Sequence, residues 1–460
     1  MAGTRLTILG GGGFRVPLVY GAVLADRSDR RVTHVVLHDT DETRLRAIGH
    51  VLSAQAQRHT ATDPGHPAPE VTLTTDLDAA LDGADFVFSA IRVGGLEGRT
   101  ADERVALDLG LLGQETTGAG GVAYGLRTIP VAVDIAERVR RLAPEAWVIN
   151  FTNPAGMVTQ AMQRVLGERV VGICDSALGV AKRAAAALGH DLAGADIDYA
   201  GLNHLGWLQG LHVGGRDALP DLLADPARLG AIEEGHLFGT EWLQTLGLLP
   251  NEYLYYYYFT RDAIAAIRDG AQTRGEFLVD QQANFYAAVA GSPADAWSTW
   301  DRVQRERNAT YMQENRAEDE ARSEEDIESG GYEGVALALM AAIARDEPAT
   351  LILNVANAGT LPGLPVDAVV EVPCRVTAAG PRPLPVTALR GAELGLVLQV
   401  KAVEELTIRA ALDGDPGRAV EALALHPLVD SVTVARQLLA GYRARIPSLD
   451  RVFTRPRPVE

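Results

Sequence analysis

Four consecutive glycines near the N-terminus have the sequence context of a loop that binds a dinucleotide. Gly10 to Gly13 lie between a strand-like run, Leu6 to Leu9, and a helical pattern that begins at Val16. Glycines between a strand and a helix allow a tight turn, and they let a pyrophosphate approach the N-terminus of the helix. The cofactor-binding residues predicted for this loop are Gly10, Gly11, Gly12, Gly13 and Phe14.

The loop departs from the Gly-x-Gly-x-x-Gly pattern, because Arg15 stands where the third glycine is expected. A plain flexible turn is the alternative interpretation of the glycines. Asp39 closes the second strand-like run, where a carboxylate can accept a hydrogen bond from a ribose 2′-hydroxyl, and this favours NAD over NADP. Asp39 or the nearby Asp41 could instead cap the helix that follows.

Strand-like and helical patterns alternate through the first two hundred residues. This alternation is typical of a parallel sheet covered by helices on both faces, so we predict an α/β, Rossmann-like, doubly wound fold. Pro130 is expected in the first turn of its helix, where its missing N–H is harmless. The predicted strands are 6–9, 32–38, 71–73, 85–91, 146–151 and 170–174, and the predicted helices are 16–26, 42–57, 130–142 and 155–165.

Beyond residue 200 the alternation weakens. We predict an NAD-binding, Rossmann-like domain over residues 1–200 and a C-terminal α+β domain over 201–460 for catalysis, substrate binding and oligomerisation. A β-rich segment, 368–377, and helices after it belong to the second domain. Residues 316–328 are so highly charged that they are expected to form a solvated loop or an exposed helix.

Composition limits the class of protein. Apolar types make up 47% of the chain and charged types 22%, which is typical of a soluble globular protein and excludes a disordered or collagen-like one. The formal net charge of −18 argues against binding to nucleic acid or to an anionic membrane surface. Two cysteines are too few for a disulfide framework, and the N-terminus lacks a signal-peptide pattern. These features predict a cytoplasmic protein.

Eight short polar motifs follow the glycine loop in a fixed order. Together with that loop they resemble the family 4 glycoside hydrolases, which are NAD- and divalent-metal-dependent glycosidases, and within them the 6-phospho-β-glucosidase branch. Each motif alone is weak, but eight in order are specific. The motifs are RVGG (92–95), GQETTG (113–118), RTIP (127–130), NFTNP (150–154), GICD (172–175), GLNH (201–204), NEYLY (251–255) and NVAN (354–357), and the resemblance extends to VEVP (370–373).

The resemblance implies a chemistry that needs no pair of catalytic carboxylates. In this family NAD oxidises the C3 hydroxyl of the sugar, a base removes the acidified C2 proton, and the aglycone leaves from C1. Water then adds and the ketone is reduced, so NAD is regenerated. The nicotinamide performs the hydride step, while the protein orients it and stabilises an enediolate. The expected activity is hydrolysis of 6-phosphoglycosides, chiefly 6-phospho-β-glucosides.

The resemblance also implies a divalent metal that bridges O2 and O3 of the sugar, with Cys174 and His204 as its protein ligands. Both residues follow predicted strands, where open α/β sheets bind ligands. The soft sulfur disfavours Mg²⁺ and leaves Mn²⁺ as the expected ion, with Fe, Co or Ni also open. Taken alone, Cys174 would more often be a small buried hydrophobe and His204 a core histidine.

The resemblance assigns the C2 base to Tyr253. A phenol has a pKa of about 10, so positive charge from the metal or from Arg274 must favour the phenolate. Residues 255–258 are also tyrosines, so the base could lie one or two positions away. For these later tyrosines the alternative is aromatic packing on a helix or at an oligomer interface.

Two carboxyl groups are candidates for the acid that protonates the leaving group. Asp175 is the acid in the family's 6-phospho-α-glucosidases, whereas the β branch usually has Asn there. Glu115, in the GQETTG loop, is the second candidate, with a helix-capping carboxylate as its alternative. The GICD motif therefore leaves α linkage open, although NFTNP, RTIP and NEYLY favour β.

Amides and guanidiniums complete the predicted site. An amide offers both a donor and an acceptor, so Asn150 is expected at the nicotinamide and Asn153 and Asn203 at sugar hydroxyls, with Asn153 equally able to cap a helix. Guanidiniums can bind the C6 anion through paired hydrogen bonds. The candidate anion-binding residues are Arg15, Arg92 and Arg274.

Other functions remain open at this point. The same arginines would hold a different C6 anion, as in a sulfoquinovoside or a glucuronide, possibly α-linked. An NAD-dependent 2-hydroxyacid dehydrogenase also has a Rossmann half, but it leaves Cys174 and Tyr253 unexplained. A non-catalytic protein that binds NAD would need only the glycine loop and Asp39. By family analogy, a homodimer or homotetramer is expected.

Overall fold

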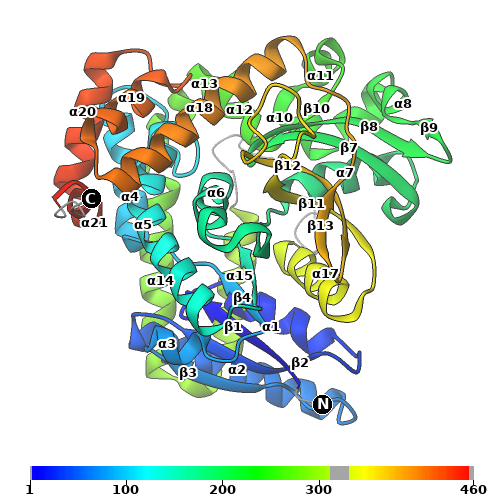
Figure 1. The fold of residues 1–460 in the computed structure, drawn as a ribbon, viewed down its shortest axis with the longest axis vertical. Coiled ribbons are helices and arrows are strands. Elements are labelled where there is room, and N and C mark those ends of the chain that lie inside the picture. The colour runs from blue at the N-terminus through cyan, green and yellow to red at the C-terminus, as the bar shows by residue number, and fades with distance from the viewer. Residues whose placement is uncertain (1–2, 311–330, 455–460) are drawn as a thin grey trace.

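Six parallel strands form one part of a continuous sheet (Figure 1). The structure is a computed structural model that describes residues 3–310 and 331–454. The spatial order β3-β2-β1-β4-β5-β6 is that of doubly wound dinucleotide-binding folds, so the predicted fold class is confirmed. The strands are β1 (Thr4–Leu9), β2 (Val32–His38), β3 (Glu70–Thr74), β4 (Phe86–Ser89), β5 (Trp147–Asn150) and β6 (Val170–Gly172).

Antiparallel strands extend the same sheet beyond β6, in the order β11-β12-β7-β8-β10. Because β7 spans residues 195–202, the sheet crosses the predicted domain boundary at residue 200, and that boundary stays a prediction. The added strands are β7 (Ala195–Leu202), β8 (Leu205–Val213), β9 (Arg216–Asp217), β10 (Leu249–Pro250), β11 (Ala349–Ala356), β12 (Val369–Thr377) and β13 (Gly380–Pro383).

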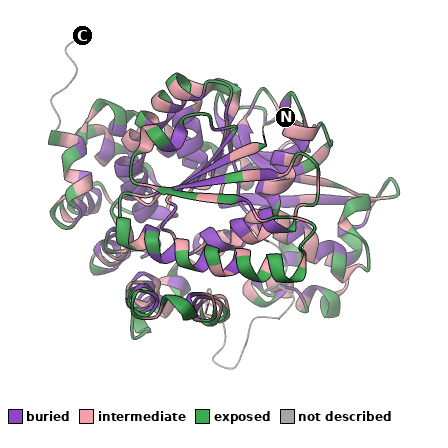
Figure 2. Ribbon diagram, turned by 90° about the horizontal axis from the view of Figure 1, so that it is seen from below, coloured by how far each residue is buried: buried purple, intermediate pink, exposed green. Residues whose placement is uncertain are grey.

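Helices cover both faces of the sheet and bury it between two cores. Figure 2 shows that buried residues fill the strands and the inner sides of the helices around them. One core includes α1 (Val16–Ala25), α2 (Glu42–Thr62), α7 (Ser176–Ala187), α14 (Arg274–Gly291), α15 (Ala296–Ala309) and α17 (Tyr332–Arg345). The other includes α5 (Gly118–Leu142), α6 (Ala155–Leu166), α18 (Gly391–Asp413), α19 (Pro416–Leu425), α20 (Val432–Arg445) and α21 (Pro447–Thr454).

Shorter elements connect these layers and border the site. They are α3 (Leu77–Leu81), α4 (Gly95–Asp108), α8 (Leu219–Leu223), α9 (Pro226–Gly230), α10 (Glu233–Phe238), α11 (Thr240–Leu246), a 3₁₀ turn at Glu252–Leu254, α12 (Tyr255–Tyr258) and α13 (Thr260–Asp269). Within the described ranges, no helix is both long and apolar enough to cross a bilayer. The charged segment 316–328, expected to be a loop or an exposed helix, lies outside the described residues.

The helix around Pro130 differs from the prediction. Pro130 lies inside α5, which begins at Gly118, instead of in the first turn of a helix. An internal proline costs a helix about 3 kcal/mol. The segment before it buries an apolar face, including Val122, Leu126 and Ile129, in the second core, and this burial outweighs the lost hydrogen bond. Propensity at one residue was therefore a poor guide to where this helix begins.

Candidate active site

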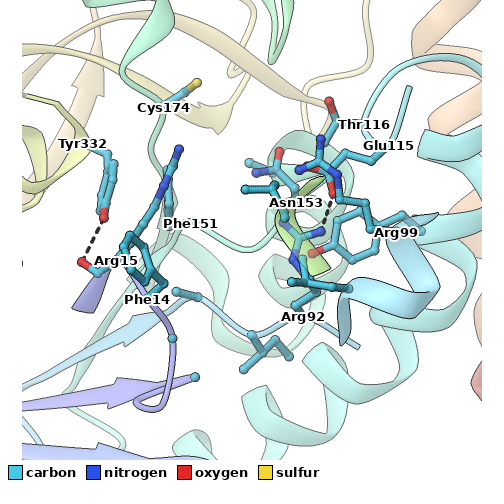
Figure 3. A pocket seen from close by; sticks show the side chains of 18 of the residues that line it. Phe14, Arg15, Arg92, Arg99, Glu115, Thr116, Phe151, Asn153, Cys174 and Tyr332 are labelled. Carbon is cyan, nitrogen blue, oxygen red and sulfur yellow. Dashed lines mark hydrogen bonds and ion pairs between the residues drawn. The ribbon is translucent and has the colours of Figure 1, made fainter. Parts of the chain in front are cut away.

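A cavity of about 1160 Å³ opens where β1, β2, β4 and β6 end. Figure 3 shows Cys174 above it, Arg15 among aromatic rings on one side, and Arg92, Arg99 and Glu115 on the other. Of the predicted site residues, Gly11, Gly12 and Asn150 do not line it. Those that do are Gly10, Gly13, Phe14, Arg15, Asp39, Arg92, Glu115, Asn153, Cys174, Asp175, Asn203, His204, Tyr253 and Arg274.

The glycine loop turns tightly beside β4. Gly10 has a φ of +79°, and a Cβ there would lie 2.6 Å from the Ala90 carbonyl oxygen, so only glycine fits. The Gly13 amide donates to the Gly10 carbonyl at 2.8 Å, which closes the turn at the start of α1. Gly11 faces Leu37 of β2 instead of the cavity, so it shapes the loop without lining the site.

Two helices from far along the chain fix the backbone of this loop. The Tyr286 hydroxyl of α14 donates to the Gly12 carbonyl at 2.6 Å, and Trp300 Nε1 of α15 donates to the Phe14 carbonyl at 2.8 Å. The Phe14 ring itself is buried against Phe285 in an edge-to-face contact. Distant aromatic side chains therefore hold the loop in shape.

The structure separates the two possible roles of Asp39. The Asp41 carboxylate accepts from the Arg44 amide and caps α2, so Asp39 is not the helix cap. Asp39 accepts from the Gly12 amide at 2.9 Å and from the Asp41 amide at 3.0 Å. A carboxylate has about four acceptor positions. Asp39 therefore retains acceptor capacity on the cavity wall, where a ribose hydroxyl could bind.

Asn150 requires a correction. Its side chain is fully buried, its Nδ2 donates to Thr159 Oγ1 at 3.0 Å and to the Thr152 carbonyl at 3.2 Å, and its Oδ1 accepts from the Thr152 amide at 3.1 Å. Both ends of the amide are thus used within the protein. Asn150 fixes the turn after β5 and does not reach the cofactor cavity, contrary to the prediction.

Asn153 lies in the same turn but faces the cavity. The cap of α6 is Pro154, so Asn153 does not cap that helix. Its Oδ1 atom is buried and has no hydrogen-bond partner among the described residues. Buried acceptors are nearly always satisfied. The Asn153 oxygen is therefore available to a metal ion or to a ligand donor.

Cys174 and His204 both line the cavity and are both 7% exposed. Cys174 lies two residues beyond β6, and His204 occupies the turn between β7 and β8 with a φ of +63°. His204 Nδ1 lies 3.1 Å from Thr116 Oγ1, and burial lowers the pKa of His204 to about 3, so the imidazole is neutral. Histidine binds metals as a neutral imidazole, with one ring nitrogen on the metal and the other held by a hydrogen bond.

The donor set fits a sparsely coordinated metal. Burial raises the pKa of Cys174, and the charges of Glu371 and Asp175 raise it further, so thiolate formation would require a bound cation. Within residues 3–310 and 331–454, no group of three or more His, Cys, Asp or Glu side chains forms a metal-binding cluster. Cys174, His204 and the unpartnered oxygen of Asn153 could hold an ion whose remaining ligands come from water or substrate.

Tyr253 is the tyrosine that contacts the metal-ligand candidate. Its ring stacks on the His204 ring with centroids 3.6 Å apart and an interplanar angle of 4°. Of the next four tyrosines, only Tyr256 lines the same cavity. Tyr255 stacks on Phe259, and the Tyr258 hydroxyl accepts from Trp207 Nε1. Packing therefore explains Tyr255 and Tyr258, whereas Tyr256 lies beside Tyr253 on the cavity wall and stays an alternative base.

Asp175 lies at the N-terminal end of α7 and lines the cavity next to Cys174. The Cys174 thiol donates to Asp175 Oδ1 over 4.0 Å. The Asp175 side chain does not bond to the helix backbone as a cap. Its carboxyl group thus lies beside Cys174 on the cavity wall and does not cap α7.

Glu115 is held between two guanidiniums. Arg92 and Arg99 pair with its two oxygens, the second at 2.7 Å. Burial alone would raise the pKa of Glu115, but the charges of Arg92 and Arg99 lower it to about 2. Glu115 is therefore ionised at neutral pH. The prediction that Glu115 protonates the leaving group is corrected, because its proton is already lost.

Arg15 and Arg274 hold defined positions around the cavity. The Arg15 guanidinium lies over the stacked rings of Phe151 and Tyr332. Arg274 donates to the carbonyls of Arg307 and Thr310 at 3.0 Å, which anchors it at the end of α15.

Sequence reasoning missed Arg307, which lies on α15. Its Nη1 atom is buried without a hydrogen-bond partner in the described part of the chain, although the residue lines the cavity. Burial lowers the pKa of Arg307, and the nearby Arg15 and Arg274 lower it further. A buried guanidinium among other cations is suited to an anionic ligand. No sequence motif distinguishes Arg307 from the exposed arginines of the same helix.

A second missed residue is Glu371 of β12, which lies in the VEVP motif. Burial raises the pKa of Glu371 to about 7, and hydrogen bonds from Asn203, Asn354 and Tyr199 oppose that rise. The carboxyl group lies in the sheet beneath the turn that carries His204. Only the strand register reveals this neighbour, because Asn203 and Glu371 are 168 residues apart.

Replacement of Glu115 by Gln should destabilise the fold. The change leaves the guanidiniums of Arg92 and Arg99 without their shared carboxylate, and breaking a buried ion pair costs about 3 kcal/mol or more. Urea unfolding of the two proteins measures the difference in the free energy of unfolding. Glu137→Gln is the matched control, because that carboxylate pairs with Arg140 on the exposed surface and should contribute less than about 1 kcal/mol.

The same pair predicts an acid-side difference. The pKa of Glu115 in the folded protein lies below the usual 4.5 of a free carboxyl, so its contribution is present above pH 4.5 and is lost as the pH falls toward 2. Glu115→Gln should lack this loss. An equal free energy of unfolding for Glu115→Gln and wild type at neutral pH would contradict the proposed charge balance.

Comparison with known proteins places the chain in a family. Residues 5–190 match the family 4 glycosyl hydrolases, and residues 199–429 match the C-terminal domain of that family. The chain is 33% identical over 451 residues to the probable 6-phospho-beta-glucosidase of Bacillus subtilis (strain 168), and the match covers 95% of both proteins.

Two solved structures have the same fold over nearly the whole chain. The 6-phospho-beta glucosidase from Thermotoga maritima, solved with manganese, NAD⁺ and glucose-6-phosphate, has a TM-score of 0.79 at 25% identity and covers 96% of this chain and 99% of its own. A 6-phospho-alpha-glucosidase from gut microorganisms, in complex with NAD and Mn²⁺, has a TM-score of 0.78 at 25% identity and covers 97% of this chain and 99% of its own. With both of its halves matched, the chain belongs to the family 4 glycosyl hydrolases.

Proposed function

We propose that this protein hydrolyses 6-phosphoglycosides, chiefly 6-phospho-β-glucosides, in a reaction that uses NAD and Mn²⁺ and regenerates the NAD. The observation that supports the proposal most is that one cavity is lined by the glycine loop, by Cys174 and His204, and by a cluster of arginines. These features fit a dinucleotide, a soft-ligand metal ion and an anionic sugar. The names of the relatives, given above, point to the same class of substrate.

The residues around the cavity suggest where each ligand would bind. Gly10, Gly13 and Asp39 would hold the dinucleotide, and Cys174 and His204 would hold the ion with the Asn153 oxygen nearby. When bound, the nicotinamide supplies a hydride acceptor and donor at C3, and the metal supplies positive charge at O2 and O3. A single cavity would keep the oxidised sugar enclosed until the hydride returns.

Tyr253 would remove the proton from C2. Its ring lies flat against the His204 imidazole, so the phenol is held beside the residue that would carry the metal. Positive charge at that point favours the phenolate and makes the phenol an effective base. After the aglycone leaves, the same group would return a proton to C2 when water has added at C1.

Asp175 would assist departure of the aglycone, and it also supports α-linked 6-phosphoglucosides as the second candidate substrates. The residue lines the cavity beside Cys174 and is the acid expected from the α branch of the family. A β-glycoside with a good leaving group needs less acid help. The related 6-phospho-alpha-glucosidase of the same fold keeps this alternative open to experiment.

The C6 anion would bind among Arg307, Arg15 and Arg274. Arg307 contributes a buried Nη1 atom that has no hydrogen-bond partner within the described residues. Arg92 and Arg99 are partly neutralised by Glu115, so their charge is less available. A sulfonate or carboxylate at C6 would meet the same guanidiniums, and an assay with each anion separates these substrates.

Family membership leaves the 2-hydroxyacid dehydrogenase and the non-catalytic NAD-binding protein without support. We further propose a cytoplasmic enzyme that forms a homodimer or homotetramer. The two cysteines, Cys174 and Cys374, are both free and buried, which is compatible with a reducing compartment.

The central test is hydrolysis of aryl 6-phospho-α- and 6-phospho-β-glucosides in D₂O, with and without NAD and Mn²⁺. We expect turnover only when both are added, a faster reaction with the β substrate, deuterium at C2 of the product and no net NADH. The corresponding 6-sulfonate and 6-carboxylate substrates serve as comparison. Turnover without NAD, with protium retained at C2, would rule out the proposed reaction.

Tyr253→Phe should slow exchange of the C2 proton. Removal of the phenol leaves no base beside His204, and loss of a general base typically costs about 100-fold or more. Exchange of C2 protium for deuterium, followed by NMR, measures the step directly. Tyr255→Phe is the control, since that ring packs on Phe238, Tyr256 and Phe259 and does not line the cavity. If both variants exchange at the wild-type rate, another group is the base.

Asp175→Asn should separate the two linkages. Without a proton donor, hydrolysis of α-linked substrates should slow by about tenfold or more, and the loss should grow as the aglycone becomes a poorer leaving group. The β-aryl substrate with the best leaving group should change least. A uniform loss across linkages and leaving groups would assign Asp175 to substrate or metal positioning instead.

A further inference from the structure

Glu371 is a buried carboxylate for which the proposed reaction has no use. It lies on β12 and is 1% exposed. Three donors converge on it: Asn354 Nδ2 at 2.9 Å, Asn203 Nδ2 at 3.2 Å and the Tyr199 hydroxyl at 3.2 Å. Both amides donate to the same oxygen, Oε1, and Tyr199 donates to Oε2. A buried carboxyl group is costly unless it is hydrogen-bonded. The three hydrogen bonds to Glu371 therefore hold their donors in fixed positions.

The strand register explains how these residues meet. Asn354 of β11 lies opposite Glu371, Gly172 of β6 lies opposite Asn354, and Gly201 of β7 lies opposite Glu371. The four positions therefore form one row across the sheet. A Cβ at Gly172 would lie 2.7 Å from the Asn354 Cβ, so glycine makes room for the asparagine. This row uses one residue from each of the GICD, NVAN, VEVP and GLNH motifs.

The contact fixes which end of the Asn203 amide faces the site. Asn203 precedes His204 and lines the cavity. Because its Nδ2 atom donates to Glu371, its Oδ1 atom is left to accept from the cavity side. We propose that Glu371 is a positioning residue that orients the Asn203 amide, so that Asn203 accepts a hydrogen bond from a sugar hydroxyl and does not donate one. This inference rests on the proposed function for the identity of the ligand.

Exchange of the hydrogen-bond donor and acceptor between residues 203 and 371 tests the contact of Asn203 with Glu371. Asn203→Asp replaces the amide donor with an acceptor, so the side chain can no longer donate to Glu371, and binding of glucose 6-phosphate should weaken by about tenfold or more. Addition of Glu371→Gln should restore most of that loss, because the Gln amide can donate to the new carboxylate while its neighbour Asn354 turns its amide. The Asn354 Oδ1 atom has no partner in the described residues, so this turn breaks no other bond.

Binding is measured by calorimetry on enzyme loaded with NAD and Mn²⁺, with KM and kcat for an aryl 6-phosphoglucoside measured in parallel. The loss and the rescue should fall on the dissociation constant and KM more than on kcat. Asn153→Asp is the matched control. It also changes an amide that lines the cavity, but no hydrogen bond in the described part of the chain joins Asn153 to Glu371, so Glu371→Gln should not rescue it. Losses that simply add in the Asn203→Asp, Glu371→Gln double variant would overturn the inference.

Thermal unfolding of wild type, the two single variants and the double variant gives an independent readout. If Asn203→Asp folds poorly, Glu371→Gln should raise its melting temperature, and no rise would overturn the inference. A wild-type enzyme that fails to bind glucose 6-phosphate would contradict the proposed substrate class. The unfolding cycle would still show in that case whether Glu371 orients Asn203.

Discussion

The row of Gly172, Asn354, Glu371 and Gly201 across the sheet is the constraint on which the site depends. It joins the parallel and antiparallel parts of the sheet, and Cys174 and His204 lie only two and three residues from its ends. Three antiparallel pairings separate β6 from β7, so these two strands run in opposite directions. The rule that carboxyl ends of parallel strands share one edge therefore does not bring the two residues together. The register of the antiparallel strands does, and any slip in that register would also leave the Glu371 carboxyl group without its donors.

Burial of charge is the second constraint. Arginines line the cavity on two sides, and the carboxylate of Glu115 balances only the charge of Arg92 and Arg99. Arg307 has a buried nitrogen without a partner in the described chain, so the protein carries a desolvation cost that an anionic ligand would offset. Such a site favours substrates whose charge is fixed, because a neutral sugar would leave the guanidinium unpaired.

Local sequence predicted the elements well and the neighbours less well. The strand ending at His38, the loop at Gly10 and the carboxylate of Asp39 follow from patterns within a few residues of one another. Cys174 and His204 were assigned by resemblance, and the structure brings them to one cavity. Asn150 has the same residue type and motif as Asn153, yet only the fold shows that its amide is used up by Thr152 and Thr159.

The remaining differences have the same physical origin. The position of Pro130 inside α5 and the unpartnered nitrogen of Arg307 on α15 both result from burial by segments that are distant in sequence. A pattern confined to one helix shows neither which face is covered nor which charge lacks a partner. Asp41 shows the opposite case, since a helix cap depends on residues only three positions away. Its role was among the alternatives that the sequence offered.

Helices of the predicted C-terminal domain hold the glycine loop of the predicted N-terminal domain. Tyr286 and Trp300, on α14 and α15, donate to the carbonyls of the glycine loop, and the same two helices carry Arg274 and Arg307, which line the cavity. A shift of these helices would move the cofactor loop and the anion site together. In the proposed reaction these two helices would therefore help to fix the nicotinamide relative to the sugar, as hydride transfer to and from the same carbon requires. If the C6 anion binds at Arg274 and Arg307 as proposed, its binding would be tied to the placement of the cofactor.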